Sequence, residues 1–379
     1  MSRTSIGSTR NFRQYFINFD KFLLLLVVLA LAVGFLAINS ATLNNEQHDR
    51  FLYRQSVAVL IGFAGFFFFS FVDYNFMARF SPQLAIGSFV LLLITAWIAP
   101  NIDGNRNWIM IGSFNLQPSE LTKICFIVSM SYHLSKLGKE INRPLNLLKI
   151  LGHFALYLVP IAMQGDIGTC VVYCVMFFVL LLVAGLKGQY FLAGGIALFA
   201  AVPVVWSFLK DYHKRRIIYG FRPDLDPLKT GFQPLISRMA IGSGGLTGLG
   251  YGHGIQSQNG LLPALHTDFI YAVIGEECGF FGCFAVLLLL AGIVLRCFRC
   301  AMRAKDNNGF LICVATGTMV LAQTLINIGM CIGVSPVIGI TLPFVSYGGS
   351  SIMSAVACMG LVMSVCVKPD TALKFGSDP

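Results

Sequence analysis

The sequence predicts an all-α integral membrane protein with about ten transmembrane helices. Hydrophobic residues make up 56% of the 379 residues and charged residues only 12%, whereas an average soluble domain has about 25% charged residues. The apolar residues fall into long runs, and a helix needs about 20 of them to cross the hydrocarbon core. The 33 Phe residues suit an exterior that faces lipid. A soluble globular enzyme is excluded.

Ten apolar stretches are each interpreted as one transmembrane helix. They are residues 21–40, 56–74, 82–99, 118–134, 146–163, 168–186, 189–209, 268–295, 309–332 and 350–367. The first follows a basic segment, as in a secretory signal, but it has no convincing cleavage site and is expected to be retained. The fourth is the weakest candidate because Glu120 and Lys123 lie in its first turns.

The distribution of basic residues predicts the topology. An even number of spans places both termini on one side. If that side is cytoplasmic, most of the 27 Lys and Arg residues lie in inside segments, and the short outside loops hold only Arg50, Arg54 and Arg106. This bias predicts cytoplasmic termini. Residues 210–267, between the seventh and eighth helices, then form one large extracytoplasmic loop. The loop is too short for a separate domain, so residues 1–379 are expected to form a single membrane domain.

That loop carries an unusual basic cluster for an outside segment. Its members are Lys210, Lys214, Arg215, Arg216, Arg222, Lys229 and Arg238. One interpretation is attraction to the anionic headgroups of membrane lipids. The other is recognition of phosphate or diphosphate, to which the planar fork of Arg is suited. In a membrane protein, the net charge of +10 does not indicate a nucleic-acid partner.

The eleven cysteines do not predict a disulfide framework. Seven lie in apolar runs, where a thiol behaves as a small hydrophobic group: Cys125, Cys170, Cys174, Cys313, Cys331, Cys358 and Cys366. Cys297 and Cys300 form a CxxC motif without a second pair at zinc spacing, so a metal or redox site is not expected there.

Ionisable residues near the membrane are functional candidates because their burial is costly. Glu120 and Lys123 share one helix face at i, i+3. They form either an ion pair that allows the helix to insert or a polar cavity in which Lys123 faces an anionic ligand. Asp166 is either an N-cap or a group at a cavity mouth. Asp268 lies at an outer helix end after the basic loop, where it is either a cap or a general base.

Two irregular segments complete the set. The glycine-rich stretch 241–254 lacks a phosphate-loop motif, and its glycines allow close approach to a ligand or a neighbouring helix. In the stretch 336–351, Pro343, Gly348 and Gly349 interrupt regular structure. Irregular backbone at membrane depth is tolerated only where it is buried in protein or lines a cavity. Ser346, Ser350 and Ser351 could donate hydrogen bonds there. A serine nucleophile is unsupported, because no His or Lys is close in the sequence.

Seven stretches together resemble the SEDS family (shape, elongation, division and sporulation). In family order they are Gly104–Ile109, Gln117–Lys123, Asp166–Thr169, Asp226–Gln233, Ile241–Gly245, His266–Ile270 and Leu342–Ser351. The chain departs from the family pattern at Asn107, Gly165, Leu249 and Ala264. The segments Phe19–Lys21 and Ala240–Ser243 resemble the RodA members more than the FtsW members.

The resemblance implies a peptidoglycan glycosyltransferase of the bacterial inner membrane that polymerises lipid II into glycan strands during elongation. It implies Asp268 as the catalytic residue and a class B penicillin-binding transpeptidase as partner. A divalent cation, Mg²⁺ or Mn²⁺, would be carried with the pyrophosphate. With the candidates above, the expected substrate contacts are Arg106, Glu120, Lys123, Asp166, Arg215, Arg216, Gln233, Arg238, Ser346 and Ser350. The alternatives are a flippase or transporter for the lipid-linked precursor and a non-catalytic scaffold.

Overall fold

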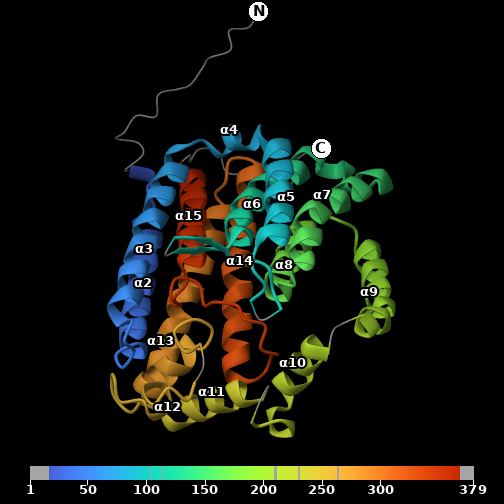
Figure 1. Cartoon of the computed structure of the whole chain (residues 1–379). Helices are drawn as coiled ribbons and strands as arrows, with labels where there is room; N and C mark the ends of the chain where they lie inside the picture. Colours follow the sequence, from blue (N-terminus) through green and yellow to red (C-terminus); the bar gives the residue numbers. More distant parts are fainter. Residues whose placement is uncertain are drawn as a thin grey trace, which may run out of the picture.

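The computed structural model describes residues 17–102, 104–112, 114–208, 211–228, 231–262 and 264–367. Helices occupy all ten stretches in which the sequence predicts a span (Figure 1). These helices are α2 (Lys21–Ala41), α3 (His48–Phe71), α5 (Ser81–Ile98), α6 (Pro118–Leu137), α7 (Pro144–Met163), α8 (Ile167–Val183), α9 (Gly188–Phe208), α13 (Ile270–Ala301), α14 (Asn307–Ile332) and α15 (Gly349–Cys366).

Shorter elements join them. They are the helices α4 (Tyr74–Ala78), α10 (Asp211–Phe221), α11 (Phe232–Ser243) and α12 (Ile255–Gln258), the 3-10 turns η1 (Gly138–Asn142) and η2 (Pro223–Leu225), and the strands β1 (Ile109–Ile111) and β2 (Phe114–Leu116). The two strands pair antiparallel, with Ile109 opposite Leu116.

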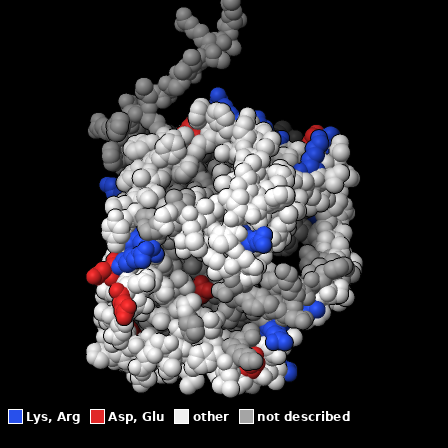
Figure 2. Space-filling model, in the orientation of Figure 1, with Lys and Arg blue, Asp and Glu red and all other residues white. Residues whose placement is uncertain are grey.

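The bundle has the surface of a membrane protein. Within the described residues, seven helices are long and apolar enough to cross a bilayer, and α8 is a shorter apolar helix. The face seen in Figure 2 is largely uncharged. Most side chains of α14 and α15 are buried, whereas α3 exposes most of its apolar side chains. The two helices α14 and α15 therefore form the centre of the bundle, and α3 belongs to its outer surface.

Local chemistry sets where the helices begin. Pro82, Pro118 and Pro144 stand at the first turns of α5, α6 and α7, where a missing N–H costs nothing. Asp166 and Asp306 cap α8 and α14 by accepting hydrogen bonds from backbone N–H groups of the first turn. Such caps satisfy donors that have no partner within the helix.

Small residues allow α15 to pack closely against α3. A Cβ atom added at Gly360 would collide with the backbone carbonyl of Phe66. Gly62 of α3 in turn lies against Val356. Transmembrane helices gain little from the hydrophobic effect, because lipid is as apolar as the neighbouring helix, so close backbone packing favours their association.

The two ends of the described chain meet at one end of the bundle. Asn18 Nδ2 donates to the carbonyl oxygen of Val367 over 3.4 Å. Asp20 caps α2 and also pairs with Arg296 of α13. This arrangement agrees with the predicted even number of crossings.

The described residues of the segment 210–267 lie at the opposite end of the bundle (Figure 1). Helix α11 lies against α13 and α14. The glycine-rich stretch approaches α13 so closely that a Cβ atom at Gly248 would collide with the carbonyl of Glu277. Two buried carboxylates of α13 hold α12: Glu276 accepts from the N–H groups of Gln256 and Ser257, and Glu277 accepts from Gln258 Nε2. The glycines therefore serve contact with a neighbouring helix.

One cysteine expectation is wrong. Cys300 of α13 and Cys366 of α15 form a disulfide, whereas the sequence analysis treated Cys366 as a small hydrophobic residue. The two residues are 66 positions apart, so their proximity depends on how α13 and α15 pack and cannot be read from a local motif. The remaining described cysteines are free thiols, and Cys297 is buried.

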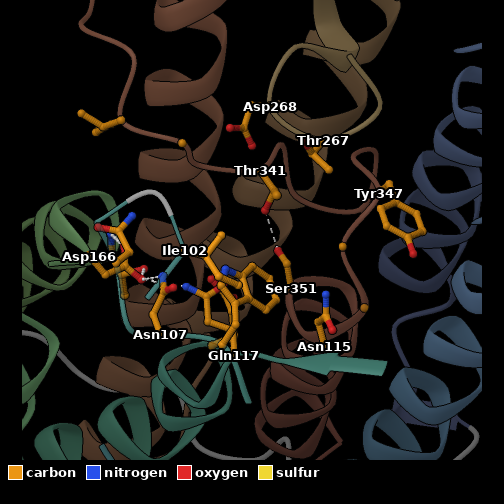
Figure 3. A pocket seen from close by; sticks show the side chains of 18 of the residues that line it. Ile102, Asn107, Asn115, Gln117, Asp166, Thr267, Asp268, Thr341, Tyr347 and Ser351 are labelled. Atoms are coloured by element: carbon orange, nitrogen blue, oxygen red, sulfur yellow. Dashed lines mark hydrogen bonds between the residues drawn. The ribbon is translucent and has the colours of Figure 1, made fainter. Parts of the chain in front are cut away.

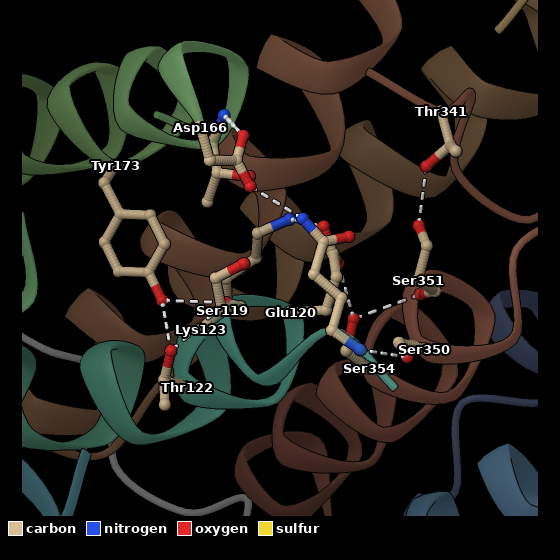
Figure 4. A network of polar contacts seen from close by, with 12 residues as sticks. Ser119, Glu120, Thr122, Lys123, Asp166, Tyr173, Thr341, Ser350, Ser351 and Ser354 are labelled. Atoms are coloured by element: carbon tan, nitrogen blue, oxygen red, sulfur yellow. Dashed lines mark hydrogen bonds and ion pairs between the residues drawn. The ribbon is translucent and has the colours of Figure 1, made fainter. Parts of the chain in front are cut away.

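Glu120 and Lys123 form a buried ion pair, with Lys123 Nζ 2.6 Å from Glu120 Oε1. Lys123 is only 1% exposed. The other oxygen of Glu120, Oε2, accepts from Ser354 of α15 over 3.0 Å (Figure 4). The pair thus joins α6 to α15, and each charge compensates the burial of the other.

We predict that removing one partner of this pair damages the protein more than removing both. Glu120→Gln and Lys123→Met each leave a buried, uncompensated charge and should lower the amount of folded protein. The amount of folded double variant, relative to wild type, should be larger than the product of the relative amounts of the two single variants. Folded protein in membranes, measured by fluorescence-detected size exclusion, checks this; strictly multiplicative effects would contradict the coupling.

Candidate active site

A polar cavity of about 490 Å³ lies among α3, α6, α8, the turn before α13 and the loop before α15. Its size is typical of a small-molecule site. The residues that line it include Phe51, Arg54, Asn107, Asn115, Gln117, Glu120, Asp166, Thr169, Thr267, Asp268, Thr341, Tyr347 and Ser351. Figure 3 shows Asp268 on the opposite side of this cavity from Asn107 and Gln117. The fold thus brings Glu120, Asp166 and Asp268 to one space.

Asp166 organises the wall formed by residues 104–117. Its Oδ2 accepts from Asn107 Nδ2 at 2.9 Å, from Gln117 Nε2 at 2.7 Å and from Thr169 Oγ1 at 2.9 Å. Its Oδ1 accepts from the N–H of Thr169 at 3.0 Å. A carboxylate has about four acceptor positions, so Asp166 is saturated. Asp166 therefore both caps α8 and lines the cavity. Its hydrogen bonds position the side chains of Asn107 and Gln117.

Asp268 is presented by a tight turn that begins at Ala264. Ala264 has φ of 52°, and its carbonyl accepts from the N–H groups of Thr267 and Asp268, both at 3.1 Å. Helix α13 begins after Phe269, without a side-chain cap hydrogen bond. Capping of α13 therefore does not account for Asp268, and the turn directs this residue to the cavity.

The loop between α14 and α15 forms the facing wall. Thr341 Oγ1 and Ser351 Oγ lie 2.8 Å apart, and both residues line the cavity. The other two predicted serines face protein backbone: Ser346 Oγ accepts from the N–H of Leu342, and Ser350 Oγ accepts from the N–H of Gln117, each over 2.8 Å. Ser346 and Ser350 thus shape the wall, and only Ser351 of the three serines lines the cavity.

Arg54 is a functional candidate that the sequence analysis missed. It lines the cavity, and its buried Nε has no hydrogen-bond partner among the residues that the structure describes. A buried guanidinium nitrogen in this state favours an anionic ligand. In the sequence, Arg54 stands out only as a charge of a short outside loop. No pattern in the sequence distinguished it, because the other residues that line the cavity come from distant segments.

The other predicted cations are placed differently. Lys123 is buried behind Glu120 and is not among the lining residues, so the structure favours the ion-pair interpretation over direct contact with a ligand. Arg106 is exposed beside the cavity, and its N–H donates to the carbonyl of Gln164 at 2.8 Å.

Arg215, Gln233 and Arg238 do not line the cavity either. Arg215 is exposed on α10. Arg238 Nη2 donates to the carbonyl of Gly333 at 3.1 Å and thereby caps α14. The side chain of Arg216, and Lys210 and Lys229, fall outside the described part of the chain. Contact of these residues with a substrate stays a prediction.

An aromatic group borders the cavity beside Asp268. The ring centroid of His266 lies 4.6 Å from that of Phe51 and 5.4 Å from that of Tyr347. Burial lowers the pKa of His266 below its ordinary value, because the low-dielectric surroundings disfavour the imidazolium. At neutral pH this histidine is therefore uncharged and acts as part of an apolar wall.

Comparisons with known proteins agree with this architecture. Residues 20–370 match the FtsW/RodA/SpoVE family, described as cell cycle proteins. A probable peptidoglycan glycosyltransferase FtsW of Geobacter sp. (strain M18) is 33% identical over 364 residues, covering 93% of this chain and 97% of the relative.

Two solved structures are similar along nearly the whole chain. One is a chain of a peptidoglycan synthase complex described as coordinating polymerization and crosslinking, with TM-score 0.80 and 30% identity, covering 92% of this chain and 97% of that chain. The other is the rod shape determining protein RodA of Thermus thermophilus, with TM-score 0.69 and 27% identity, covering 92% and 96%. The chain therefore belongs to the FtsW/RodA/SpoVE family.

Proposed function

We propose that the chain is a peptidoglycan glycosyltransferase that polymerises lipid II into glycan strands. The observation that carries this proposal is the placement of Asp268 in a polar cavity that also holds Arg54. A general base and a cation for a diphosphate are the two groups that such a transfer needs. The naming of relatives as probable peptidoglycan glycosyltransferases supports it.

The reaction forms one bond and breaks one. A sugar hydroxyl of the acceptor saccharide attacks the anomeric carbon of the lipid-linked donor saccharide, and the hydroxyl proton passes to the carboxylate of Asp268. The bond between that carbon and the diphosphate oxygen breaks, and undecaprenyl diphosphate leaves with the electron pair. Arg54 stabilises the charge on the leaving group, while Asn107, Gln117 and Thr341 orient the sugars.

A divalent cation, Mg²⁺ or Mn²⁺, is proposed to enter with the diphosphate. Among the described residues, no group of three or more His, Cys, Asp or Glu side chains could hold a metal ion. Because Mg²⁺ is commonly bound through substrate phosphates, the diphosphate would supply most of the ligands. Loss of polymerisation in chelator, with recovery on addition of Mg²⁺ or Mn²⁺, would support this; full activity in chelator would exclude it.

We place the protein in the bacterial inner membrane with ten spans, cytoplasmic termini and residues 210–267 outside, together with a class B penicillin-binding transpeptidase. The basic bias of short loops supports the orientation, and the similar chain from a synthase complex supports the partner. Reporters fused after residue 379 and within residues 255–258 should lie on opposite faces; the same face for both would overturn this topology.

For the cellular stage we propose elongation, from the resemblance of Phe19–Lys21 and Ala240–Ser243 to RodA members. The similar proteins include both FtsW and RodA. Complementation separates the two stages: restoration of rod shape in cells depleted of RodA supports elongation, and restoration of division in cells depleted of FtsW would instead assign division.

We predict that Asp268→Asn slows polymerisation by at least about 10²-fold but leaves a measurable residual rate. An amide cannot accept the hydroxyl proton, and loss of a general base costs about 10²–10⁴-fold in rate. Asn has nearly the size of Asp, and the turn is held through the backbone N–H and carbonyl of this residue, so the variant should stay folded. Glycan synthesis from lipid II by purified protein is the measurement, with Glu46→Gln, an exposed carboxylate outside the cavity, as the control.

Near wild-type polymerisation by Asp268→Asn would remove this residue from the mechanism. The role of general base would then pass to Asp166 or Glu120. Failure of the wild-type protein to polymerise lipid II would instead favour a flippase or a scaffold.

We also predict that Arg54→Gln weakens use of the donor. Loss of one charge-assisted hydrogen bond to the diphosphate should raise the donor KM by about tenfold or more. Arg50→Gln, exposed one turn earlier on α3, is the matched control. Arg215→Gln tests the basic loop in the same assay. A KM that rises only for Arg215→Gln would move the diphosphate site from the cavity to α10.

A further inference from the structure

Two of the segments around the cavity, the turn that presents Asp268 and the loop between α14 and α15, are attached to one buried amide on α14. Asn327 is completely buried. Its Nδ2 donates to the carbonyl of Asp268 over 2.8 Å and to the carbonyl of Ile340 over 2.7 Å. The first acceptor lies in the turn that presents Asp268, and the second lies in the loop between α14 and α15. One NH₂ group therefore joins two segments 72 residues apart (340 − 268).

These contacts fix the backbone of Asp268 on both sides. Its N–H donates to the carbonyl of Ala264 at 3.1 Å, and its carbonyl accepts from Asn327 and, more weakly, from Cys331 Sγ at 3.7 Å. The backbone of Asp268 is therefore held through both its N–H and its carbonyl group. The position of its carboxylate relative to α14 follows from this clamp.

The second hydrogen bond matters because the loop lies directly against that carboxylate. A Cβ atom added at Gly339 would lie 3.5 Å from Asp268 Oδ2, so the backbone of Gly339 borders the carboxylate. Asn327 holds the next residue, Ile340. The same amide therefore determines both the position of Asp268 and the position of the wall beside it.

An asparagine is well suited to this place. A primary amide carries two N–H donors on one nitrogen, so it can serve two carbonyls at once. Leu has a similar volume but no donor, and the single hydroxyl of Ser can serve only one of the two carbonyls. The acceptors would then be buried without partners and would move to find others.

We propose that Asn327 is a positioning residue for the transfer reaction: it sets the Asp268 carboxylate against the wall formed by Gly339 and Ile340. It acts through Asp268 and does not contact the substrate. The inference rests on the proposed glycosyl transfer. A displacement of about 1 Å at a reacting group can cost about 10²-fold in rate, so the effect should fall on turnover.

The experiment measures kcat and donor KM for glycan synthesis from lipid II by purified full-length protein. Asn327→Leu is expected to lower kcat by about 10²-fold and to leave KM within about twofold, because the groups that bind the donor are untouched. The matched control is Thr324→Val, which is buried one turn earlier on α14. Among the described residues, the hydroxyl of Thr324 bonds only to Val320 of its own helix. This control should keep both constants.

A second comparison separates positioning from a general loss of structure. If Asn327 acts through the carboxylate, Asn327→Leu should cause no further loss in a protein that already carries Asp268→Asn. Multiplicative losses in the double variant, an equal loss in Thr324→Val, or unchanged kcat in Asn327→Leu would each overturn the inference. Should Asn327→Leu fail to accumulate as folded protein, Asn327→Ser is judged by the same criteria.

Failure of the proposed function is recognised separately. Wild-type protein that does not polymerise lipid II in this assay would contradict the glycosyltransferase proposal, and with it the inference. An active wild type with unaffected Asn327 variants would contradict only the role of Asn327.

Discussion

The structure depends on one constraint: polar groups buried within an apolar bundle must find partners inside the protein. A cavity lined by amides, hydroxyls and carboxylates is costly in this setting unless nearly every group is hydrogen-bonded. The chain meets this constraint with a few residues that each serve several partners. Asp166 accepts four hydrogen bonds, Glu120 joins Lys123 to Ser354, and Asn327 donates to two carbonyls. The irregular segments around the cavity are therefore fixed from within.

This constraint also separates the roles of the three carboxylates. Asp166 accepts four hydrogen bonds, and Glu120 is paired with a lysine, so both stabilise the walls. Asp268 stands in a turn outside regular structure, held by its backbone and not by a cap of α13. A residue that must accept a proton from a substrate needs this combination of a fixed backbone and a side chain at the cavity surface.

Much of this could be predicted from the sequence, for identifiable reasons. Apolar length predicts where each long helix lies, and the cost of burying charge marks Glu120, Asp166 and Asp268 as candidates. The sequence could not show that Ser346 and Ser350 face backbone while Ser351 faces the cavity, because this depends on how an irregular loop packs. Nor could it reveal Arg54, Asn327 or the Cys300–Cys366 disulfide, whose partners come from distant segments. Substrate contacts from Arg215 and Gln233 stay predictions.

The central claim is that the cavity beside Asp268 receives the lipid-linked diphosphate and its sugar. The most direct measurement is photo-crosslinking of a lipid II analogue that carries a photoreactive group next to the diphosphate, followed by mass spectrometry of the labelled peptides. The account predicts adducts on Arg54, in residues 104–117 and in residues 337–351, which surround the cavity, and competition by unlabelled lipid II. Adducts confined to α10 and α11, with the cavity unlabelled, would contradict it.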